Sequence, residues 1–414
     1  MRFRCARALL LGAMLCAAVH PADAGWFGGG AKGDAAAADT GAAEGPGSRQ
    51  ECRVAEHLPT PAQLKKEMPA PADALATVKS ARDKIQMLLD AGDNRVLVVV
   101  GPCSIHDPVE ALAYAAKLSL LAKELDNELI IVMRTYFEKP RTRLGWKGFV
   151  NDPLKDRSFD VAAGLKRARE VLIDINKLGL PCATEFLDPL VAPYIADLIS
   201  YGSTGARTVD SQIHREMTSG LGMPVGVKHD VYGHHDEGMN ALLAAAQPHV
   251  HLGLSDDGVV SRITTTGNKH AHLVLRGGGE LSATGFRGVC VCVCVCARAC
   301  VLMCVFVCVC FYTAMIWVHV LSSHTNPGFN YDERTIQDAS ARLSVFNLCK
   351  KVVVDCSHGN MGVPKDLKLT VAAIKDLMNQ VSGCACALVC VCLSIHLSMN
   401  LSIRPSTNLS MNLL

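Results

Sequence analysis

The sequence predicts an α/β fold, a TIM-type (β/α)8 barrel with an N-terminal helical arm, lacking the eighth strand and interrupted by a low-complexity insertion. Three observations predict it. Short apolar runs typical of buried strands alternate with helical stretches, the pattern of a parallel sheet with right-handed crossovers. Side chains that can bind anions or metals, namely Arg, Lys, Cys and His, lie at the ends of several of these runs. The length of 414 residues is also enough for one barrel, which takes about 250 residues.

The first 51 residues are expected to precede the folded part. Residues 1–24 have the pattern of a secretory signal, with a basic start, a short apolar core and the cleavage motif Ala22-Asp23-Ala24. A wrongly assigned start codon is the alternative. Residues 25–51 are rich in Gly and Ala and predict a flexible linker. The signal predicts entry into the secretory route, with a plastid as one destination and the cytoplasm as the alternative location.

Residues 52–95 are expected to form the helical arm. One helix should begin at Thr60-Pro61, where Pro suits the first helical position, and a second should span 73–90. The barrel is then divided between 96–280 and 327–381. Its expected strands are 96–103, 129–136, 181–186, 204–209, 224–229, 272–277 and 351–356. Helices are expected at 109–125, 160–178, 190–200 and 365–381, and a hairpin is expected from 249–254 and 259–266.

Residues 281–326 are interpreted as a translated intron. Val and Cys alternate from Val289 to Cys296, as a translated GT repeat would make them, and eight of the 19 cysteines lie between Cys290 and Cys310. The apolar stretch 289–321 is also long enough to be a candidate membrane span. Residues 382–414 form an aberrant low-complexity tail in place of the eighth strand. Four more cysteines cluster between Cys384 and Cys392, and the seven outside both clusters are scattered, which is typical of a reducing compartment.

The charge pattern gives no reason to expect nucleic acid as a partner. The formal net charge is +2, and the basic residues are spread along the chain without a basic block. Four anion-binding groups lie instead where the second predicted strand ends and opens into a loop. They are Arg134, Lys139, Arg141 and Thr142, within nine residues. At the carboxyl end of a barrel strand, such a group predicts a site for phosphate or carboxylate. Cys103 and His358 end two further runs and suggest that a metal assists the reaction on phosphorylated substrates.

Eight motifs occur in an order that resembles one enzyme family. They are Gly101-Pro102-Cys103-Ser104-Ile105-His106-Asp107, Arg134 to Thr142, Gly145-Trp146-Lys147-Gly148, Glu185-Phe186-Leu187-Asp188, Gly205-Ala206-Arg207-Thr208, Pro224-Val225-Gly226-Val227-Lys228, Leu275-Arg276-Gly277-Gly278 and Asp355-Cys356-Ser357-His358-Gly359-Asn360. Together they resemble type I 3-deoxy-D-arabino-heptulosonate 7-phosphate (DAHP) synthase. The resemblance covers about 52–280 and 327–381.

The resemblance implies the first step of aromatic amino-acid biosynthesis through chorismate, the shikimate pathway. Phosphoenolpyruvate and erythrose 4-phosphate would condense with release of phosphate, assisted by a divalent metal. It also implies the following roles. Arg207, Lys228 and Arg276 hold the phosphate of phosphoenolpyruvate; Arg134 and Lys139 hold its carboxylate, with Lys139 also available for proton transfer; Arg141 and Thr142 hold erythrose 4-phosphate; Cys103 and His358 bind the metal.

The metal identity stays open among Mn, Fe, Co and Zn, because a set of S, N and O donors suits all four. The family completes its metal site with a Glu and an Asp from the eighth strand and the loop after it, for which this chain has no matching segment. Family members also suggest a homo-oligomer and an aromatic amino-acid effector. Two alternatives remain: a 3-deoxy-octulosonate 8-phosphate synthase, which Lys139-Pro140-Arg141-Thr142 disfavours, and a non-catalytic or membrane-tethered remnant.

Overall fold

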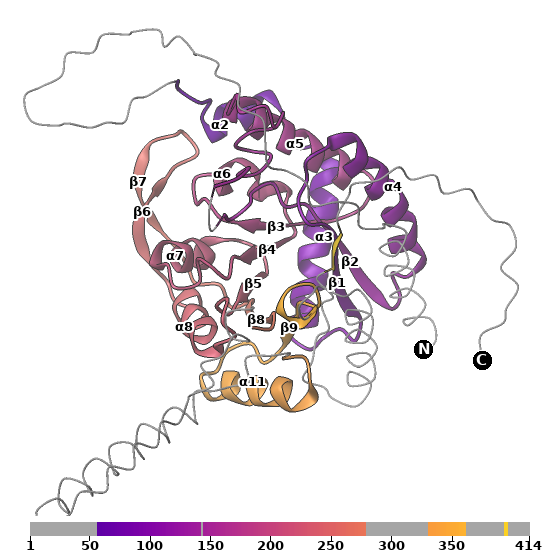
Figure 1. The fold of residues 1–414 in the computed structure, drawn as a ribbon, viewed down its shortest axis with the longest axis vertical. Coiled ribbons are helices and arrows are strands. Elements are labelled where there is room, and N and C mark those ends of the chain that lie inside the picture. The colour runs from indigo at the N-terminus through magenta and orange to yellow at the C-terminus, as the bar shows by residue number, and fades with distance from the viewer. Residues whose placement is uncertain (1–55, 142–143, 279–329, 362–392, 396–414) are drawn as a thin grey trace, which may run out of the picture.

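The computed structural model describes residues 56–141, 144–278, 330–361 and 393–395. Their centre is a parallel eight-stranded sheet with the order β10-β1-β2-β3-β4-β5-β8-β9. Figure 1 shows this sheet curling round, with helices along its outer side. The strands are β1 (Val96–Pro102), β2 (Leu129–Arg134), β3 (Cys182–Phe186), β4 (Tyr201–Thr204), β5 (Val225–Lys228), β8 (Ala271–Leu275), β9 (Val352–Val354) and β10 (Leu393–Ile395). The predicted fold class, an incomplete (β/α)8 barrel, is confirmed.

Two strands differ from the prediction. The fourth strand begins at Tyr201, three residues before the expected range, so that Arg207 falls in the turn after it. The tail was expected to contribute no strand, yet β10 pairs in parallel with β1, with Leu393 opposite Val100 and Ile395 opposite Pro102. The exposed backbone edge of β1 accepts a strand almost regardless of side chains, since the pairing uses main-chain groups. Within the described residues no pairing joins β10 to β9, so the curl stays open there.

The helices follow the predicted alternation with the strands. They are α2 (Pro61–Glu67), α3 (Ala72–Leu89), α4 (Pro108–Glu124), α5 (Val161–Lys177), α6 (Ala192–Ile195), α7 (Gln212–Gly220), α8 (His235–Ala245) and α11 (Glu333–Val345), with the short 3-10 helix η1 (Ala196–Leu198) extending α6 and η2 (Gly359–Met361) near the end. The helix expected at 190–200 is thus found in two short pieces. The α2 helix begins with a capping box, in which Thr60 and Gln63 satisfy each other's backbone N–H groups.

The second arm helix, α3, packs against the inner face of the sheet. Ile85, Leu88 and Leu89 are buried in one cluster with strand residues that include Leu97 and Val99. These strand residues lie two apart in β1, so they point to the same face, while Val96, Val98 and Val100 belong to the larger cluster that contacts the helices. The arm therefore covers the end of the barrel at which the strands begin, and leaves the other end for the site.

The predicted hairpin is confirmed after the fifth barrel strand. β6 (Val250–Leu254) and β7 (Val260–Thr264) pair in antiparallel fashion and form a separate two-stranded sheet. Figure 1 shows the hairpin standing at the edge of the molecule beside α6 and α7. One of its faces exposes three large apolar side chains beside Arg262 and Thr264, since the exposed fractions of Val250, Leu252 and Val260 are 63%, 78% and 73%.

Several predicted segments lie outside the described residues. They are the signal-like residues 1–24, the linker 25–51, the insertion 281–326 with the candidate span 289–321, and the helix 365–381. Within the ranges that the structure does describe, no helix combines the length and apolar character that crossing a membrane requires.

Candidate active site at the carboxyl ends of the strands

The loops after β1 and β2 bring Cys103 and Lys139 together. Lys139 Nζ lies 2.7 Å from Cys103 Sγ, and it also donates a hydrogen bond of 2.7 Å to the backbone oxygen of Cys103. Arg134 Nη2 lies 3.5 Å from the same oxygen. Burial lowers the pKa of Lys139, partly offset by the charge of Cys103. An ammonium group at this distance favours the thiolate form of a cysteine, which is the form that binds metals.

The loop carrying Lys139 is held by its own backbone and by Glu138. Lys139 N donates to Lys147 O, and Glu138 forms a bridge with Gly148, where φ is +119° and a Cβ atom would lie 2.3 Å from Phe137 O. The buried Glu138 carboxyl accepts backbone hydrogen bonds from Leu187 and Asp188 after β3. Burial raises the pKa of Glu138 to about 8. Glu138 therefore links the loop after β2 to the loop after β3 by hydrogen bonds, next to the candidate site.

Lys228, the last residue of β5, reaches across the barrel interior to β3. Its Nζ lies 2.6 Å from Glu185 Oε1, and both side chains are almost fully buried. Burial alone would raise the pKa of Glu185, but the charges of Lys228 and Arg134 outweigh it and hold that pKa below the ordinary value. Arg134 also stacks on Tyr136, with Cζ 3.9 Å from the ring centroid, and Lys228 Nζ lies 5.5 Å from the same centroid.

The ends of β8 and β9 contribute Arg276, Asp355 and His358. His358 Nδ1 lies 2.5 Å from Asp355 Oδ2. Burial would raise the pKa of Asp355, but His358 and Lys228 lower it, so this carboxyl stays ionised. Burial lowers the pKa of Arg276, while Asp355 and Glu185 raise it in part. Arg276 Nη1 is buried and has no hydrogen-bond partner among the described residues. Buried donors are normally hydrogen-bonded, so an anionic substrate is a suitable partner for this one.

The remaining predicted residues lie nearer the surface. Arg207 is exposed in the turn after β4, and its charge lowers the pKa of Arg276, which places the two cations near each other. Arg141 is exposed and donates from Nε to Trp146 O at 2.7 Å. Thr142 lies outside the described residues. The structure thus brings together six of the predicted residues, Cys103, Arg134, Lys139, Lys228, Arg276 and His358.

Cys103 and His358 are the two residues predicted to bind a metal. His358 Nδ1–H donates to Asp355 Oδ2, which leaves the lone pair on Nε2, and a carboxylate behind a ligating His is the usual arrangement in metal proteins. The donor set is incomplete, however, because no group of three or more His, Cys, Asp and Glu side chains suited to a metal is found in the described ranges.

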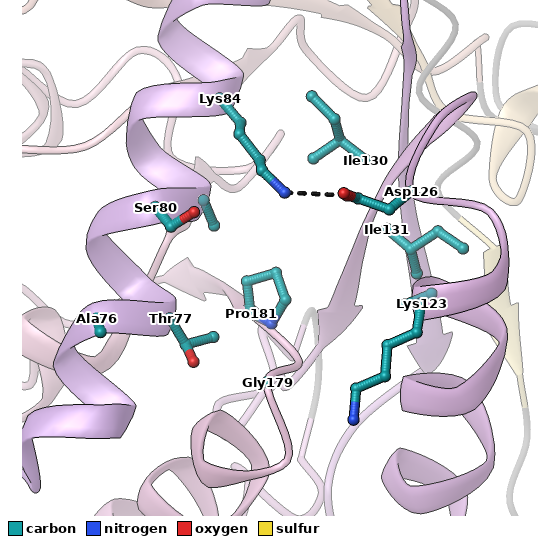
Figure 2. Close-up of a pocket in the computed structure, with 12 residues that line it drawn as sticks. Ala76, Thr77, Ser80, Lys84, Lys123, Asp126, Ile130, Ile131, Gly179 and Pro181 are labelled. Atoms are coloured by element: carbon teal, nitrogen blue, oxygen red, sulfur yellow. Dashed lines mark hydrogen bonds and ion pairs between the residues drawn. The ribbon is translucent and has the colours of Figure 1, made fainter.

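A separate cavity of about 490 Å³ lies at the opposite end of the barrel. It is bounded by α3, α4 and the starts of β2 and β3, including Ile130 and Pro181. Figure 2 shows Lys84 of α3 reaching Asp126 beyond α4, at 2.9 Å. Barrel enzymes place their chemistry at the carboxyl ends of the strands. This cavity therefore does not belong to the candidate site.

Three residues of this site have no role that the sequence alone predicts. Glu185 and Asp355 stand inside the quoted motifs, and Tyr136 lies between Arg134 and Lys139. A carboxylate three residues before a His at a strand end is the only sequence signal for Asp355. Nothing in the sequence pairs Glu185 with Lys228, which lies 43 residues away.

A curled parallel sheet with cations at its carboxyl ends defines a class, the (β/α)8-barrel enzymes that bind anionic substrates. The model of the DAHP synthetase I family matches residues 76–293. A Phe-sensitive phospho-2-dehydro-3-deoxyheptonate aldolase of Escherichia coli (strain K12) is 38% identical over 344 residues, 83% of this chain and 84% of that protein. The chain belongs to the DAHP synthetase I family.

Other relatives agree with this family. A Tyr-sensitive phospho-2-dehydro-3-deoxyheptonate aldolase of Salmonella typhimurium is 51% identical over 221 residues, and the match spans 53% of this chain and 62% of that relative. The solved structure of the phospho-2-dehydro-3-deoxyheptonate aldolase of Francisella tularensis SCHU S4 superposes with a TM-score of 0.69 at 34% identity, over 84% of this chain and 86% of that one. The resemblance inferred from the eight motifs is confirmed.

Proposed function

We propose that the chain condenses phosphoenolpyruvate with erythrose 4-phosphate to DAHP and phosphate, the first step of aromatic amino-acid biosynthesis. In this reaction the methylene carbon of phosphoenolpyruvate bonds to the aldehyde carbon, water adds to the neighbouring carbon, and phosphate leaves. The observation that carries the proposal is the convergence of Arg134, Lys139, Lys228 and Arg276 beside Cys103 and His358. The two alternatives find no support among the relatives, which carry the first activity in their names.

Substrate binding follows from the placement of the cations. Arg276, Lys228 and the nearby Arg207 would hold the phosphate of phosphoenolpyruvate. Nη1 of Arg276 is available for this, since it has no hydrogen-bond partner within the described ranges. Arg134 and Lys139, which meet at the backbone oxygen of Cys103, would hold its carboxylate. Guanidinium groups suit this task because their planar fork binds two oxygens at once. Arg141 and Thr142 are assigned to erythrose 4-phosphate by the family resemblance alone.

Lys139 is also the group suited to move a proton. Burial lowers its pKa, so its ammonium releases a proton more readily than an exposed lysine does. When bound, a divalent metal would supply Lewis acidity toward the aldehyde oxygen. Cys103 and His358 would hold it, and Asp355 would orient His358 through the bond to Nδ1.

Replacing Cys103 tests the proposal. We expect the full chain to release phosphate from phosphoenolpyruvate only when erythrose 4-phosphate and a divalent metal are both present. Cys103→Ala should reduce this rate about 10³-fold or more, the equivalent of the several kcal/mol that a Lewis acid contributes. Cys349→Ala is the matched control, since Cys349 is also a partly exposed free thiol but lies before β9. Equal rates for Cys103→Ala and the wild-type chain would remove Cys103 from the site.

An aromatic amino-acid effector is proposed from the names of the relatives, which are Tyr-, Phe- or Trp-sensitive. A groove of about 550 Å³ between the hairpin, α6 and α7 has the size and apolar lining that an aromatic side chain needs. Its lining includes Pro189, Leu190, Ile213, Met217, Leu254 and Ile263.

Introducing a carboxylate into this groove by the substitution Ile263→Asp tests the proposed effector site. One of the three aromatic amino acids should lower the rate of phosphate release, and Ile263→Asp should abolish that inhibition because a carboxylate replaces apolar lining. Val345→Asp is the control, because Val345 is exposed on α11 and does not line this groove. Inhibition that survives Ile263→Asp would place the effector elsewhere.

Two further expectations stay predictions. A homo-oligomer is favoured by the exposed apolar side chains of Val250, Leu252 and Val260, since exposed apolar patches of this kind often form interfaces. Light scattering that gives a monomer mass would contradict it. The plastid location is checked by import of a fusion carrying residues 1–50, and retention in the secretory lumen would count against it.

A further inference from the structure

Arg276 is held through its backbone by a buried histidine. His229, directly after Lys228, is fully buried, and its Nε2 accepts a hydrogen bond of 2.9 Å from the backbone N–H of Arg276. Its Nδ1 lies 2.9 Å from the backbone oxygen of Asp230, which can only accept, so we assign the proton to Nδ1 and the lone pair to Nε2. Burial lowers the pKa of His229 to about 3, so the ring is neutral near pH 7 and keeps this lone pair.

Asn330 holds the next peptide along the chain. Its Oδ1 accepts from the backbone N–H of Gly277 at 2.8 Å, and its Nδ2 lies 2.8 Å from His229 Nε2. Asn330 is itself fixed from the other side, because its backbone N–H donates to Asn360 Oδ1 at 2.9 Å. The amide of Asn360 in turn donates to the backbone oxygen of Asp355 at 3.0 Å. The N–H groups of Arg276 and Gly277 are therefore both bonded to buried side chains from other parts of the chain.

The close approach at Gly277 shows how tightly this backbone is held. Gly277 has φ +71°, and a Cβ atom there would lie 2.5 Å from the backbone nitrogen of Asn360. The side chain of Arg276 extends from this backbone, and its Nη1 is buried without a hydrogen-bond partner in the part of the chain that the structure describes. A long side chain that binds an anion gains affinity when its backbone is already placed, because less conformational freedom is lost on binding.

We propose that His229 and Asn330 are positioning residues that aim Arg276 at the phosphate of phosphoenolpyruvate. This inference rests on the proposed function for the identity of the substrate, but not for the binding of phosphate as such. Neither residue would touch the substrate. They would act through the backbone of Arg276, so their loss should weaken the binding of phosphate groups more than it slows the chemical step.

The chain offers a matched control in His272. This histidine is also fully buried, and burial lowers its pKa to about 4. Its Nε2 lies 2.9 Å from Tyr201 Oη and its Nδ1 lies 2.9 Å from the backbone oxygen of His270, in the interior of the barrel. Replacing His272 with Phe removes a buried ring that forms two hydrogen bonds, and replacing His229 removes one that forms three. Only the replacement of His229 releases Arg276.

The experiment compares His229→Phe, His229→Asn, His272→Phe and the wild-type full chain in two measurements. Calorimetry with inorganic phosphate measures binding without turnover, and steady-state kinetics measure KM for each substrate separately. We expect His229→Phe to weaken phosphate binding and to raise KM for phosphoenolpyruvate about tenfold, the equivalent of one lost hydrogen bond. KM for erythrose 4-phosphate should change little. His229→Asn keeps an acceptor and should recover part of the loss, while His272→Phe should lower thermal stability only.

The two measurements separate the inference from the proposed function. Weaker phosphate binding by His229→Phe in a chain without turnover would support the positioning role and contradict the proposed function. Turnover by the wild-type chain, with phosphate affinity and KM for phosphoenolpyruvate unchanged in His229→Phe, would overturn the positioning role alone. Equal losses of phosphate binding in His229→Phe and His272→Phe would also overturn it, since a general effect on folding would then explain both. A wild-type chain that binds no phosphate would overturn both proposals.

Discussion

Lys228→Met is expected to destabilise the folded chain by about 3–5 kcal/mol, because it leaves the carboxylate of Glu185 buried without its 2.6 Å partner. The loss should depend on pH. In the wild-type chain the pKa of Glu185 is below its ordinary value. The pair therefore stabilises the fold fully when the pH is above the pKa of Glu185 in the unfolded chain, and this stabilisation is lost as the pH falls. Without Lys228, burial should raise that pKa, so the variant should lose stability as the pH rises. Urea unfolding at pH 5 and pH 8 measures the difference.

Two variants control this prediction. Lys228→Met combined with Glu185→Gln removes the uncompensated charge and should recover much of the stability. Lys79→Met breaks an exposed pair, in which Lys79 and Asp83 keep 78% and 54% of their side-chain exposure, and should change stability by less than about 1 kcal/mol. A Lys228→Met chain as stable as Lys79→Met would show that the buried pair does not hold β5 and β3 together.

Lys139→Met is expected to lower kcat by about 10² to 10⁴-fold, the range for loss of a group that transfers a proton. The physical reason is its position, since Nζ lies 2.7 Å from Cys103 Sγ at the centre of the site. Because burial lowers the pKa of Lys139, the wild-type rate should also fall on the alkaline side at a lower pH than an exposed lysine would give. Steady-state phosphate release between pH 6 and pH 10 measures both effects.

Lys147 provides the control for Lys139. It lies in the same loop, and its backbone oxygen accepts the hydrogen bond from Lys139 N, but its side chain is exposed. Lys147→Met should therefore leave kcat within about twofold of the wild-type value, since an exposed side chain outside the site has little to contribute. If Lys139→Met changed KM for phosphoenolpyruvate without changing kcat, Lys139 would bind the carboxylate and take no part in proton transfer.

Apolar pattern predicted most of the strands because each is buried on both faces. Val96 to Val100 and Val352 to Val354 are continuous β-branched or aliphatic runs, which is the composition that parallel strands need. The fourth strand was placed too late because Tyr201-Gly202-Ser203-Thr204 has no such run. β10 could not be predicted, since its pairing with β1 depends on a free backbone edge that exists only once the sheet has formed.

The sequence by itself determined the family, the order of strands and helices, and the cations that follow the strand ends, because strand burial and the quoted motifs are local properties of the chain. Only the tertiary structure decided which charges neutralise one another. Glu185 lies against Lys228 and Asp355 against His358. His229 accepts from the backbone N–H of Arg276, and Asn330 accepts from that of Gly277. The curl of the sheet brings Glu185 to Lys228 and Asn330 to His229 over separations of 43 and 101 residues, whereas Asp355 and His358 are local in the sequence and only their burial needed the fold.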